Sequence, residues 1–143
     1  MCVVIAADTV IVATNLSGDL VVLGQPPEQK DWCEVVRHWF QTYYAGRTHE
    51  AWTAVCVRTE EGQSREAVVQ TAITMTAQVE RHLDWYLDSG EPQGKAGGYA
   101  IQGAGSLFVT QVSGSLSNVV GLPLEALRRS EEHTSELQSP YVI

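Results

Sequence analysis

Val3-Val4-Ile5-Ala6-Ala7-Asp8-Thr9-Val10-Ile11-Val12 is the stretch on which the fold prediction rests. The run is apolar and mostly β-branched apart from Asp8 and Thr9, which predicts a buried strand. A turn cluster at residues 15–19 and a short apolar run at residues 20–23 predict that this strand is the first half of a hairpin. Burying a carboxylate in such a strand is costly without a partner. Asp8 is therefore either a strand-end aspartate hydrogen-bonded to nearby amides, or a general base or metal ligand that meets a cleft.

Helical and strand periods alternate along the rest of the chain. Pro26-Pro27-Glu28 predicts the start of a helix that Gly46 ends. The inward-facing positions of this helix are expected to be Trp32, Val35, Val36, Trp39, Phe40 and Tyr43. Apolar and polar residues alternate with a period of two over residues 48–58 and 65–74, on either side of a turn at residues 60–64. This pattern predicts a second hairpin.

The C-terminal half predicts two more helices and a strand. Thr76 is the expected N-cap of a helix that reaches residue 88 and ends at Gly90. Its inward face is expected to hold Val79, Leu83, Tyr86 and Leu87. A strand at residues 107–112 and a helix at residues 119–128, cut short just after Pro123, complete one domain of mixed α/β type.

Composition excludes several classes of function. The chain has 143 residues, enough for one domain, and a formal net charge of −8, which argues against a broad basic surface for nucleic acid. No apolar run approaches the length of a membrane span, and the first residues lack the features of a secretory signal. The cysteines, Cys2, Cys33 and Cys56, are far apart, which favours a reducing cytoplasm over a disulfide framework or a zinc site.

A glycine-rich segment at residues 89–103 is the best candidate for binding an anion. Lys95 lies among glycines, so its ammonium and the backbone amides of residues 94–98 could approach a phosphate together. The segment is not a P-loop, because Ala96 stands where a Ser or Thr would hold magnesium. Gln102 could hydrogen-bond a base edge or be structural, and Arg47 could hold a phosphate or pair with one of the carboxylates. His38, His49 and His82 are expected to be structural or solvent-facing.

Residues 129–139 read as the in-frame translation of a common sequencing adapter. We therefore divide the chain into a domain at residues 1–128 and a read-through tail at residues 129–143, expected to be disordered or loosely helical.

Six short motifs occur in a fixed order along the chain. They are Ala7-Asp8-Thr9, Leu23-Gly24-Gln25-Pro26, Gly46-Arg47-Thr48-His49, Ser89-Gly90-Glu91-Pro92 with Lys95-Ala96-Gly97, Tyr99 with Ile101-Gln102-Gly103, and Asn118-Val119-Val120-Gly121-Leu122-Pro123-Leu124. In this order and rough spacing they resemble the Maf family over nearly all of residues 3–128. The resemblance implies a mixed, twisted sheet flanked by helices with a deep cleft, as in ITPase-like folds, and a homodimer.

The resemblance also implies an activity: hydrolysis of dTTP or UTP to the monophosphate and pyrophosphate. Asp8 matches the family's catalytic base beside a divalent cation, Mg²⁺ or Mn²⁺, for which it is also the expected ligand. Thr9 and Gln102 match positions that help select the base, and Lys95 matches a phosphate-contacting lysine. Gln25 and Arg47 are the remaining expected substrate contacts.

Two departures from the family pattern leave a second function open. The family opens with a Ser-x-Ser-Pro-Arg-Arg phosphate loop, and this sequence begins after it; Gln25 also stands where the family usually has Lys. Losing one such electrostatic contact can lower turnover by roughly 10²–10³. The alternative to an active pyrophosphatase is therefore an inactive nucleotide-binding or dimerising remnant. A phosphatase with Asp8 as nucleophile is disfavoured, because Val10 stands where its second aspartate would be.

Overall fold

The computed structural model describes residues 2–132 and 141–142. Five strands form an antiparallel sheet in the order β2-β1-β3-β4-β5, and the two-residue β6 pairs with β4 in parallel, so the predicted α/β class with a mixed sheet is confirmed. The strands are β1 (Val3–Thr14), β2 (Leu20–Leu23), β3 (Thr48–Thr59), β4 (Ser64–Met75), β5 (Val109–Ser113) and β6 (Tyr141–Val142).

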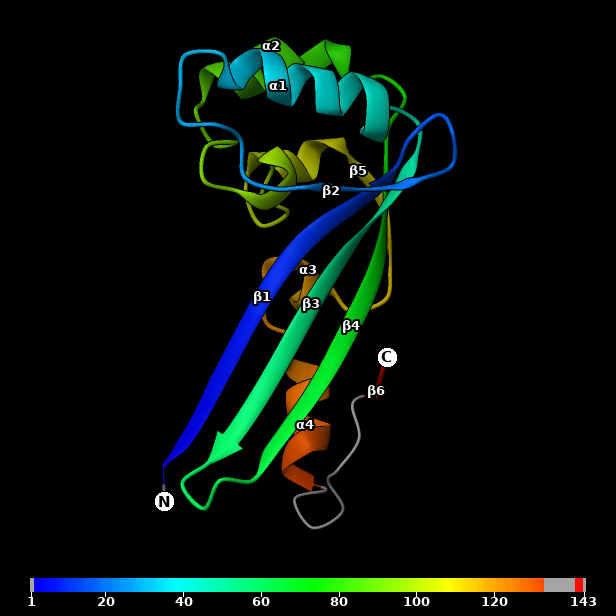
Figure 1. Ribbon diagram of the computed structural model, residues 1–143. Helices are drawn as coiled ribbons and strands as arrows, with labels where there is room; N and C mark the ends of the chain where they lie inside the picture. The colour runs from blue at the N-terminus through cyan, green and yellow to red at the C-terminus, as the bar shows by residue number, and fades with distance from the viewer. Residues whose placement is uncertain (1, 133–140, 143) are drawn as a thin grey trace.

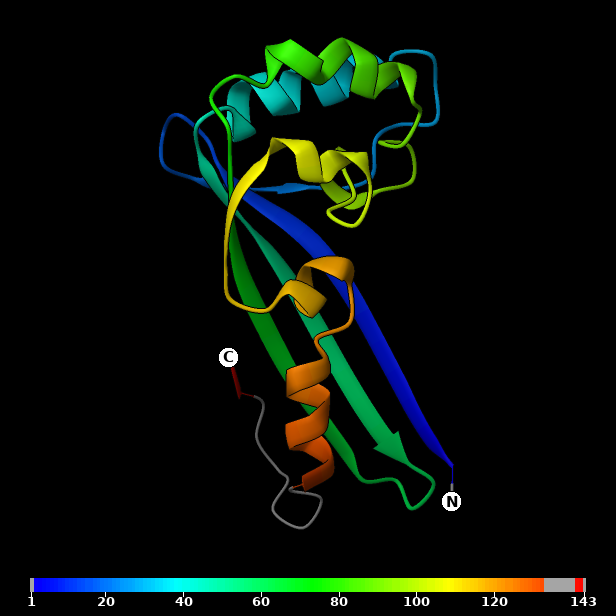
Figure 2. The same cartoon turned by 180° about the vertical axis from the view of Figure 1, so that it is seen from behind.

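The helices occupy two regions of the sheet. They are α1 (Trp32–Trp39), η1 (Phe40–Tyr44), α2 (Glu80–Asp88), η2 (Ala96–Gly98), η3 (Ala104–Phe108), α3 (Leu116–Val120) and α4 (Leu124–Glu132). Figure 1 shows α1 and α2 together at one end of the sheet, while α3 and α4 follow one face of the long strands β1, β3 and β4. The opposite view shows that face directly (Figure 2). Among the described residues, no helix has both the length and the apolar character needed to cross a membrane.

Both predicted hairpins are confirmed, and each turn is stabilised by hydrogen bonds and a glycine within the turn itself. In the first, the side chain of Asn15 accepts hydrogen bonds from the amides of Ser17 and Asp19 at 2.9 Å each, and Gly18 takes the positive φ that the turn requires. In the second, Thr59 donates to the carbonyl of Gln63 at 2.9 Å, with Gly62 at positive φ. These two turns fix the registers of β1 with β2 and of β3 with β4.

The first helix differs from its prediction at its start. It begins at Trp32 rather than at the proline pair, because a residue before proline avoids helical geometry, and Pro26 precedes Pro27. It continues as the π-helix η1, in which the amide of Ala45 donates to the carbonyl of Phe40. Its fully buried side chains are Val36, Phe40 and Tyr44, whereas Trp32, Val35, Trp39 and Tyr43 are only half-buried.

The second helix is confirmed with one change. Its predicted inward residues, Val79, Leu83, Tyr86 and Leu87, are all buried, and Gly90 follows its end at positive φ. Thr76 caps a turn rather than the helix itself: its Oγ1 accepts from the amide of Gln78 at 3.2 Å, and α2 begins at Glu80.

The single predicted C-terminal helix is two helices. Gly121, at φ +123°, ends α3, and Pro123 precedes α4. The helix α4 reaches Glu132, so residues 129–132 of the expected tail are helical, and Tyr141–Val142 pairs with β4. The rest of the expected tail lies outside the described residues.

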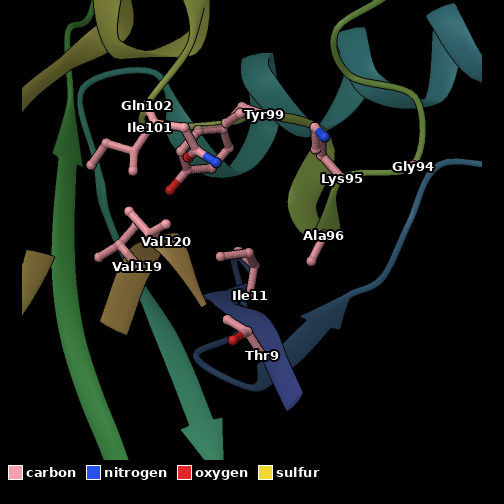
Figure 3. Close-up of a pocket in the computed structure, with 11 residues that line it drawn as sticks. Thr9, Ile11, Gly94, Lys95, Ala96, Tyr99, Ile101, Gln102, Val119 and Val120 are labelled. Atoms are coloured by element: carbon pink, nitrogen blue, oxygen red, sulfur yellow. The ribbon is translucent and has the colours of Figure 1, made fainter. Parts of the chain in front are cut away.

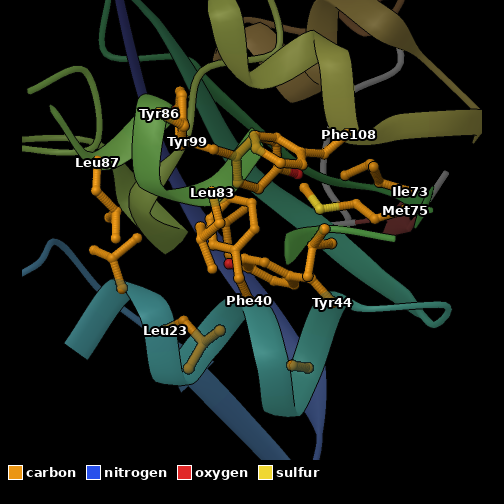
Figure 4. Close-up of a cluster of buried hydrophobic side chains, with 14 of the residues drawn as sticks. Leu23, Phe40, Tyr44, Ile73, Met75, Leu83, Tyr86, Leu87, Tyr99 and Phe108 are labelled. Carbon is orange, nitrogen blue, oxygen red and sulfur yellow. The ribbon is translucent and has the colours of Figure 1, made fainter. Parts of the chain in front are cut away.

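The main core lies between α1, α2 and the upper part of the sheet. Figure 4 shows its aromatic centre, where Phe40 packs edge-on against Tyr44 and Phe108 at ring-centroid distances of 5.0 and 4.9 Å. Tyr86 packs edge-on against Phe108 at 5.2 Å. Edge-to-face pairs add to the burial energy of such rings, so this cluster stabilises the packing of η1 and α2 against η3.

The lower half of the sheet is covered on one face only. There β1, β3 and β4 extend past the core with α4 behind them, and no helix of the described chain lies in front (Figure 1). Val4 on the open face is 60% exposed. The strand β2 pairs only with residues 11–14 of β1, so the outer edge of residues 3–10 has no partner among the described strands.

Candidate functional site

A pocket of about 130 Å³ lies between β1, the glycine-rich segment and α3. Three of the predicted site residues, Thr9, Lys95 and Gln102, line it together, although they are far apart in sequence (Figure 3). Apolar side chains of Ile11 and Val119 and the ring of Tyr99 complete its walls. The combination of apolar walls with a few polar groups is typical of small-molecule sites, but the volume is below the 300–1,000 Å³ of most of them.

Gly97 anchors the segment that carries Lys95. Its amide donates to the carbonyl of Gly24 at 2.9 Å, and its carbonyl accepts from the hydroxyl of Tyr44 at 2.6 Å. At φ +71°, a Cβ at this position would lie 2.6 Å from the Tyr44 hydroxyl and 2.7 Å from Ile11. Only glycine allows this close approach of backbone to core.

The expectation that the backbone amides of residues 94–98 bind a phosphate is wrong in part. The amides of Lys95, Gly97 and Gly98 donate to the carbonyls of Pro92, Gly24 and Lys95. These three donors hold the loop itself and are not free for a ligand. The exposed ammonium of Lys95 is therefore the main feature that this loop offers to an anion.

Glu91 holds the other half of the glycine-rich segment, a role that the sequence did not reveal. Its carboxylate accepts from the Tyr86 hydroxyl at 2.6 Å and from the amides of Ala104 and Gly105 at 2.8 and 2.9 Å. The largest influence on its pKa is burial, which acts to raise it, but these donors outweigh burial and lower the pKa of Glu91. The glutamate before the glycines was visible in the sequence, but two of its partners, the amides of Ala104 and Gly105, lie more than ten residues away.

Tyr99 is held from behind the pocket by His49. The Nε2 of His49 lies 2.6 Å from the hydroxyl of Tyr99, and its ring packs at 4.3 Å from that of Tyr44. Burial lowers the pKa of His49 to about 3, so the ring is neutral, and its tautomer decides which of the two groups donates. The structural role expected for His49 is confirmed, and the same bond sets the tilt of the Tyr99 ring that faces the pocket.

Two buried threonines and Asn118 attach α3 to the sheet below the pocket. The Nδ2 of Asn118 donates to the carbonyls of Ala51 and Val69 and to Thr71 Oγ1. Thr53 Oγ1 donates to the carbonyl of Asn118 at 3.2 Å, and it lies 2.8 Å from Thr9 Oγ1. These contacts place Val119 and Val120 against Thr9.

Asp8 does not lie where its motif suggested. It is in the middle of β1 rather than at a strand end, opposite Ala54 of β3. Since successive side chains of a strand alternate, it projects to the open face while Thr9 projects to the pocket. It lines a shallow hollow there with Ala54 and Glu66, and it is not among the residues lining the pocket that contains Lys95.

The carboxylate of Asp8 is nevertheless available for chemistry. It is exposed and has no hydrogen-bond or ion-pair partner among the described residues, so the amide-bonded alternative is not what the structure shows. No three His, Cys, Asp or Glu side chains in the described part of the chain are placed to hold a metal. Mg²⁺ needs no such cage, because it keeps several waters and binds through one or two carboxylates plus substrate phosphates. Asp8 therefore fits a cation shared with a substrate.

Gln25 and Arg47 lie at the margins of the site. Gln25 is exposed and follows Gly24, whose carbonyl accepts from Gly97, so it is next to the Lys95 loop. The guanidinium of Arg47 donates to the carbonyls of Thr42 and Thr14 at 2.7 Å each. These bonds join the end of η1 to the end of β1, so Arg47 pairs with backbone carbonyls rather than with carboxylates, and both its role and that of Gln25 toward substrate stay predictions.

The fold and the pocket define a small α/β protein with a pocket that combines apolar walls with one exposed ammonium group. Residues 1–133 match the Maf-like protein family, and the chain belongs to this family. It is 45% identical over 125 residues to a dTTP/UTP pyrophosphatase of Anaeromyxobacter dehalogenans (strain 2CP-C), covering 85% of this chain and 59% of the relative. A dTTP/UTP pyrophosphatase of Bartonella quintana (strain Toulouse) is 39% identical over 122 residues, covering 85% of this chain and 49% of the relative. The chain thus spans about half to three fifths of the length of these relatives.

Proposed function

We propose that this chain carries the base-recognition part of a nucleoside triphosphate pyrophosphatase that cleaves dTTP or UTP to the monophosphate and pyrophosphate. The convergence of Thr9, Lys95 and Gln102 on one pocket supports this proposal most directly. The similar proteins of known name are dTTP/UTP pyrophosphatases, which is the source of the proposed substrates.

The residues divide between the two ends of the substrate. The base enters between Thr9 and Gln102, with the ring of Tyr99 as a wall, and the ammonium of Lys95 attracts the phosphates. Gln25 and Arg47 are proposed as further substrate contacts, with Arg47 also holding the end of β1. In this proposal the triphosphate extends from the pocket past the outer edge of residues 3–10 toward the carboxylate of Asp8.

Asp8 is the proposed catalytic base. Its carboxylate takes a proton from water as the water oxygen attacks the α-phosphorus, the bond from that phosphorus to the bridging oxygen breaks, and pyrophosphate leaves. A bound Mg²⁺ or Mn²⁺ would supply charge neutralisation on the phosphates, and Asp8 would be its protein ligand. We also propose a homodimer in the cytoplasm, the latter because Cys2, Cys33 and Cys56 are free thiols.

The test is an assay of the 143-residue chain with dTTP or UTP and Mg²⁺, in which pyrophosphate and orthophosphate are measured separately. Pyrophosphate is the expected product, and Asp8→Asn is expected to lower turnover by roughly 10²–10⁴. Glu66→Gln is the matched control, because it removes a charge from the same open face two strands away.

The outcomes separate the parts of the proposal. Orthophosphate as the only product would place the cleavage at another bond. Full activity of Asp8→Asn would remove Asp8 from catalysis. Nucleotides that raise the melting temperature without any turnover would support the alternative, a chain that binds but does not cleave.

A further inference from the structure

The hydroxyl of Thr9 faces the pocket, but its proton is committed elsewhere. A hydroxyl has one proton to donate and lone pairs that accept. Thr53 Oγ1 lies 3.2 Å from the carbonyl of Asn118, which can only accept, so the proton of Thr53 goes there. Thr9 Oγ1, at 2.8 Å from Thr53 Oγ1, must then be the donor of that contact.

Burial makes this arrangement firm. Thr53 and Asn118 are both 0% exposed, so no water competes for either group. The carbonyl of Asn118 also accepts from the amide of Gly121 at 3.0 Å, but both contacts of the buried Thr53 hydroxyl are hydrogen bonds only when Thr53 donates to this carbonyl and accepts from Thr9. Thr9 is therefore left with lone pairs, and no proton, for whatever enters the pocket.

The neighbourhood of Thr9 keeps these lone pairs accessible. A Cβ at Gly121 would lie 3.7 Å from Thr9 Oγ1, so the glycine leaves open space beside the hydroxyl. Figure 3 shows Thr9 and Gln102 at opposite ends of the pocket, with Val119 and Val120 between them. Gln102 can donate or accept, whereas Thr9 can only accept.

We propose that Thr53 and the carbonyl of Asn118 determine base specificity by fixing the Thr9 hydroxyl as a hydrogen-bond acceptor. Uracil and thymine present a ring N–H at the position where cytosine has an unprotonated ring nitrogen. A hydroxyl that can only accept forms a hydrogen bond with the ring N–H of uracil or thymine. Opposite cytosine its lone pair faces the lone pair of the ring nitrogen, which is unfavourable. The inference rests on the proposed function. It adds two buried residues, Thr53 and Asn118, that determine which pyrimidine binds although neither contacts the base.

The test compares the affinities of the α,β-methylene analogues of UTP and CTP, which cannot be cleaved between the α and β phosphates, in the presence of Mg²⁺. The wild-type chain is expected to prefer the UTP analogue. Thr53→Val removes the acceptor and frees the Thr9 hydroxyl to rotate, which is expected to lower this preference about tenfold. Thr53→Ser, which keeps the hydroxyl, is expected to restore it.

Thr71→Val is the matched control. Thr71 is also buried, and its Oγ1 donates to the carbonyl of Ser115 and accepts from Asn118, so the variant weakens the docking of α3 without touching Thr9. Its preference should equal that of wild type. If Thr53→Val does not fold, Thr9→Val replaces it, with an expected loss of about tenfold for the UTP analogue and none for the CTP analogue.

Each other outcome has one meaning. The inference is overturned if a folded Thr53→Val variant, or Thr9→Val in its place, keeps the wild-type preference for the UTP analogue. It is also overturned if Thr71→Val loses as much of this preference as Thr53→Val. Equal affinities in wild type overturn the inference and leave the proposed function standing. No binding of either analogue overturns the proposed function and the inference with it.

Discussion

Replacing Glu91 by Gln should destabilise the protein strongly for a nearly isosteric change. Its carboxylate receives three hydrogen bonds, from the Tyr86 hydroxyl and from the amides of Ala104 and Gly105. An amide has only one acceptor oxygen, so its NH₂ group would face at least one of these donors. Hydrogen bonds to charged groups contribute about 1.5–3 kcal/mol, and an unpaired buried donor costs about 1–3 kcal/mol. We expect a loss of about 2–4 kcal/mol in the free energy of unfolding.

The measurement is thermal and urea unfolding at pH 7. For a chain of this size the loss corresponds to a melting temperature lower by roughly 6–16 °C. Glu61→Gln is the control, because it makes the same change of charge on an exposed turn residue. Tyr86→Phe, which removes one of the three donors, should lose about 1 kcal/mol.

The pH dependence gives a second, independent check. The pKa of Glu91 is lowered in the folded state, so its contribution is complete above its unfolded pKa and is lost as the pH falls through the folded value. The stability gap between wild type and Glu91→Gln should therefore narrow below about pH 4.5. A variant that melts with wild type at pH 7, or a gap that does not change with pH, would show that the carboxylate does not hold this segment.

Two further predictions concern the backing of the pocket. Gly97→Ala should cost about 1–3 kcal/mol more than Gly94→Ala, because both residues have φ above +70° but only a Cβ at Gly97 would meet Tyr44 and Ile11; equal melting temperatures would refute this. His49→Gln should flatten the pH dependence of stability: the folded pKa of His49 is lowered to about 3, so wild type should lose roughly 2 kcal/mol more than the variant between pH 7 and pH 5 as the unfolded histidine takes up a proton. Parallel curves for the two proteins in chemical unfolding across that range would contradict a neutral, buried His49.

Local chemistry decided which elements could be predicted from the sequence. The hairpin turns were readable because Asn15 and Gly18 act within a few residues, and the inward face of α2 was readable because its four apolar residues recur at helical spacing. The start of α1 could not be predicted in this way, because Pro26 and Pro27 are compatible both with the first turn of a helix and with the extended segment that the structure contains. The break between α3 and α4 was not predicted, although Gly121 and Pro123 both mark it in the sequence.

The site divided along the same line. Thr9, Lys95 and Gln102 line one pocket, and only the resemblance to a family suggested all three as site residues, since no local rule joins positions so far apart. The roles of Glu91, Thr53 and Asn118 needed the tertiary contacts themselves. Placing Asp8 at a strand end was a different kind of error. The period of two along β1 already implied that Asp8 and Thr9 face opposite sides of the sheet, and the motif led us to treat them as one cluster.

In the proposed function, the separation of Asp8 from Thr9 divides recognition of the base from cleavage of the phosphates. The pocket of about 130 Å³ is smaller than most ligand sites, so the proposal places the base in it and the sugar and phosphates outside it, along Lys95 and the open edge of β1. Selectivity should then depend on the Thr9–Thr53–Asn118 chain, and turnover on the carboxylate one residue away on the other face. Changes at the two positions should accordingly be additive, because each acts on a different end of the substrate from a different face of the strand. If Asp8→Asn altered the preference between the UTP and CTP analogues as much as Thr53→Val does, base and phosphates would be read by one connected site, and this division would be wrong.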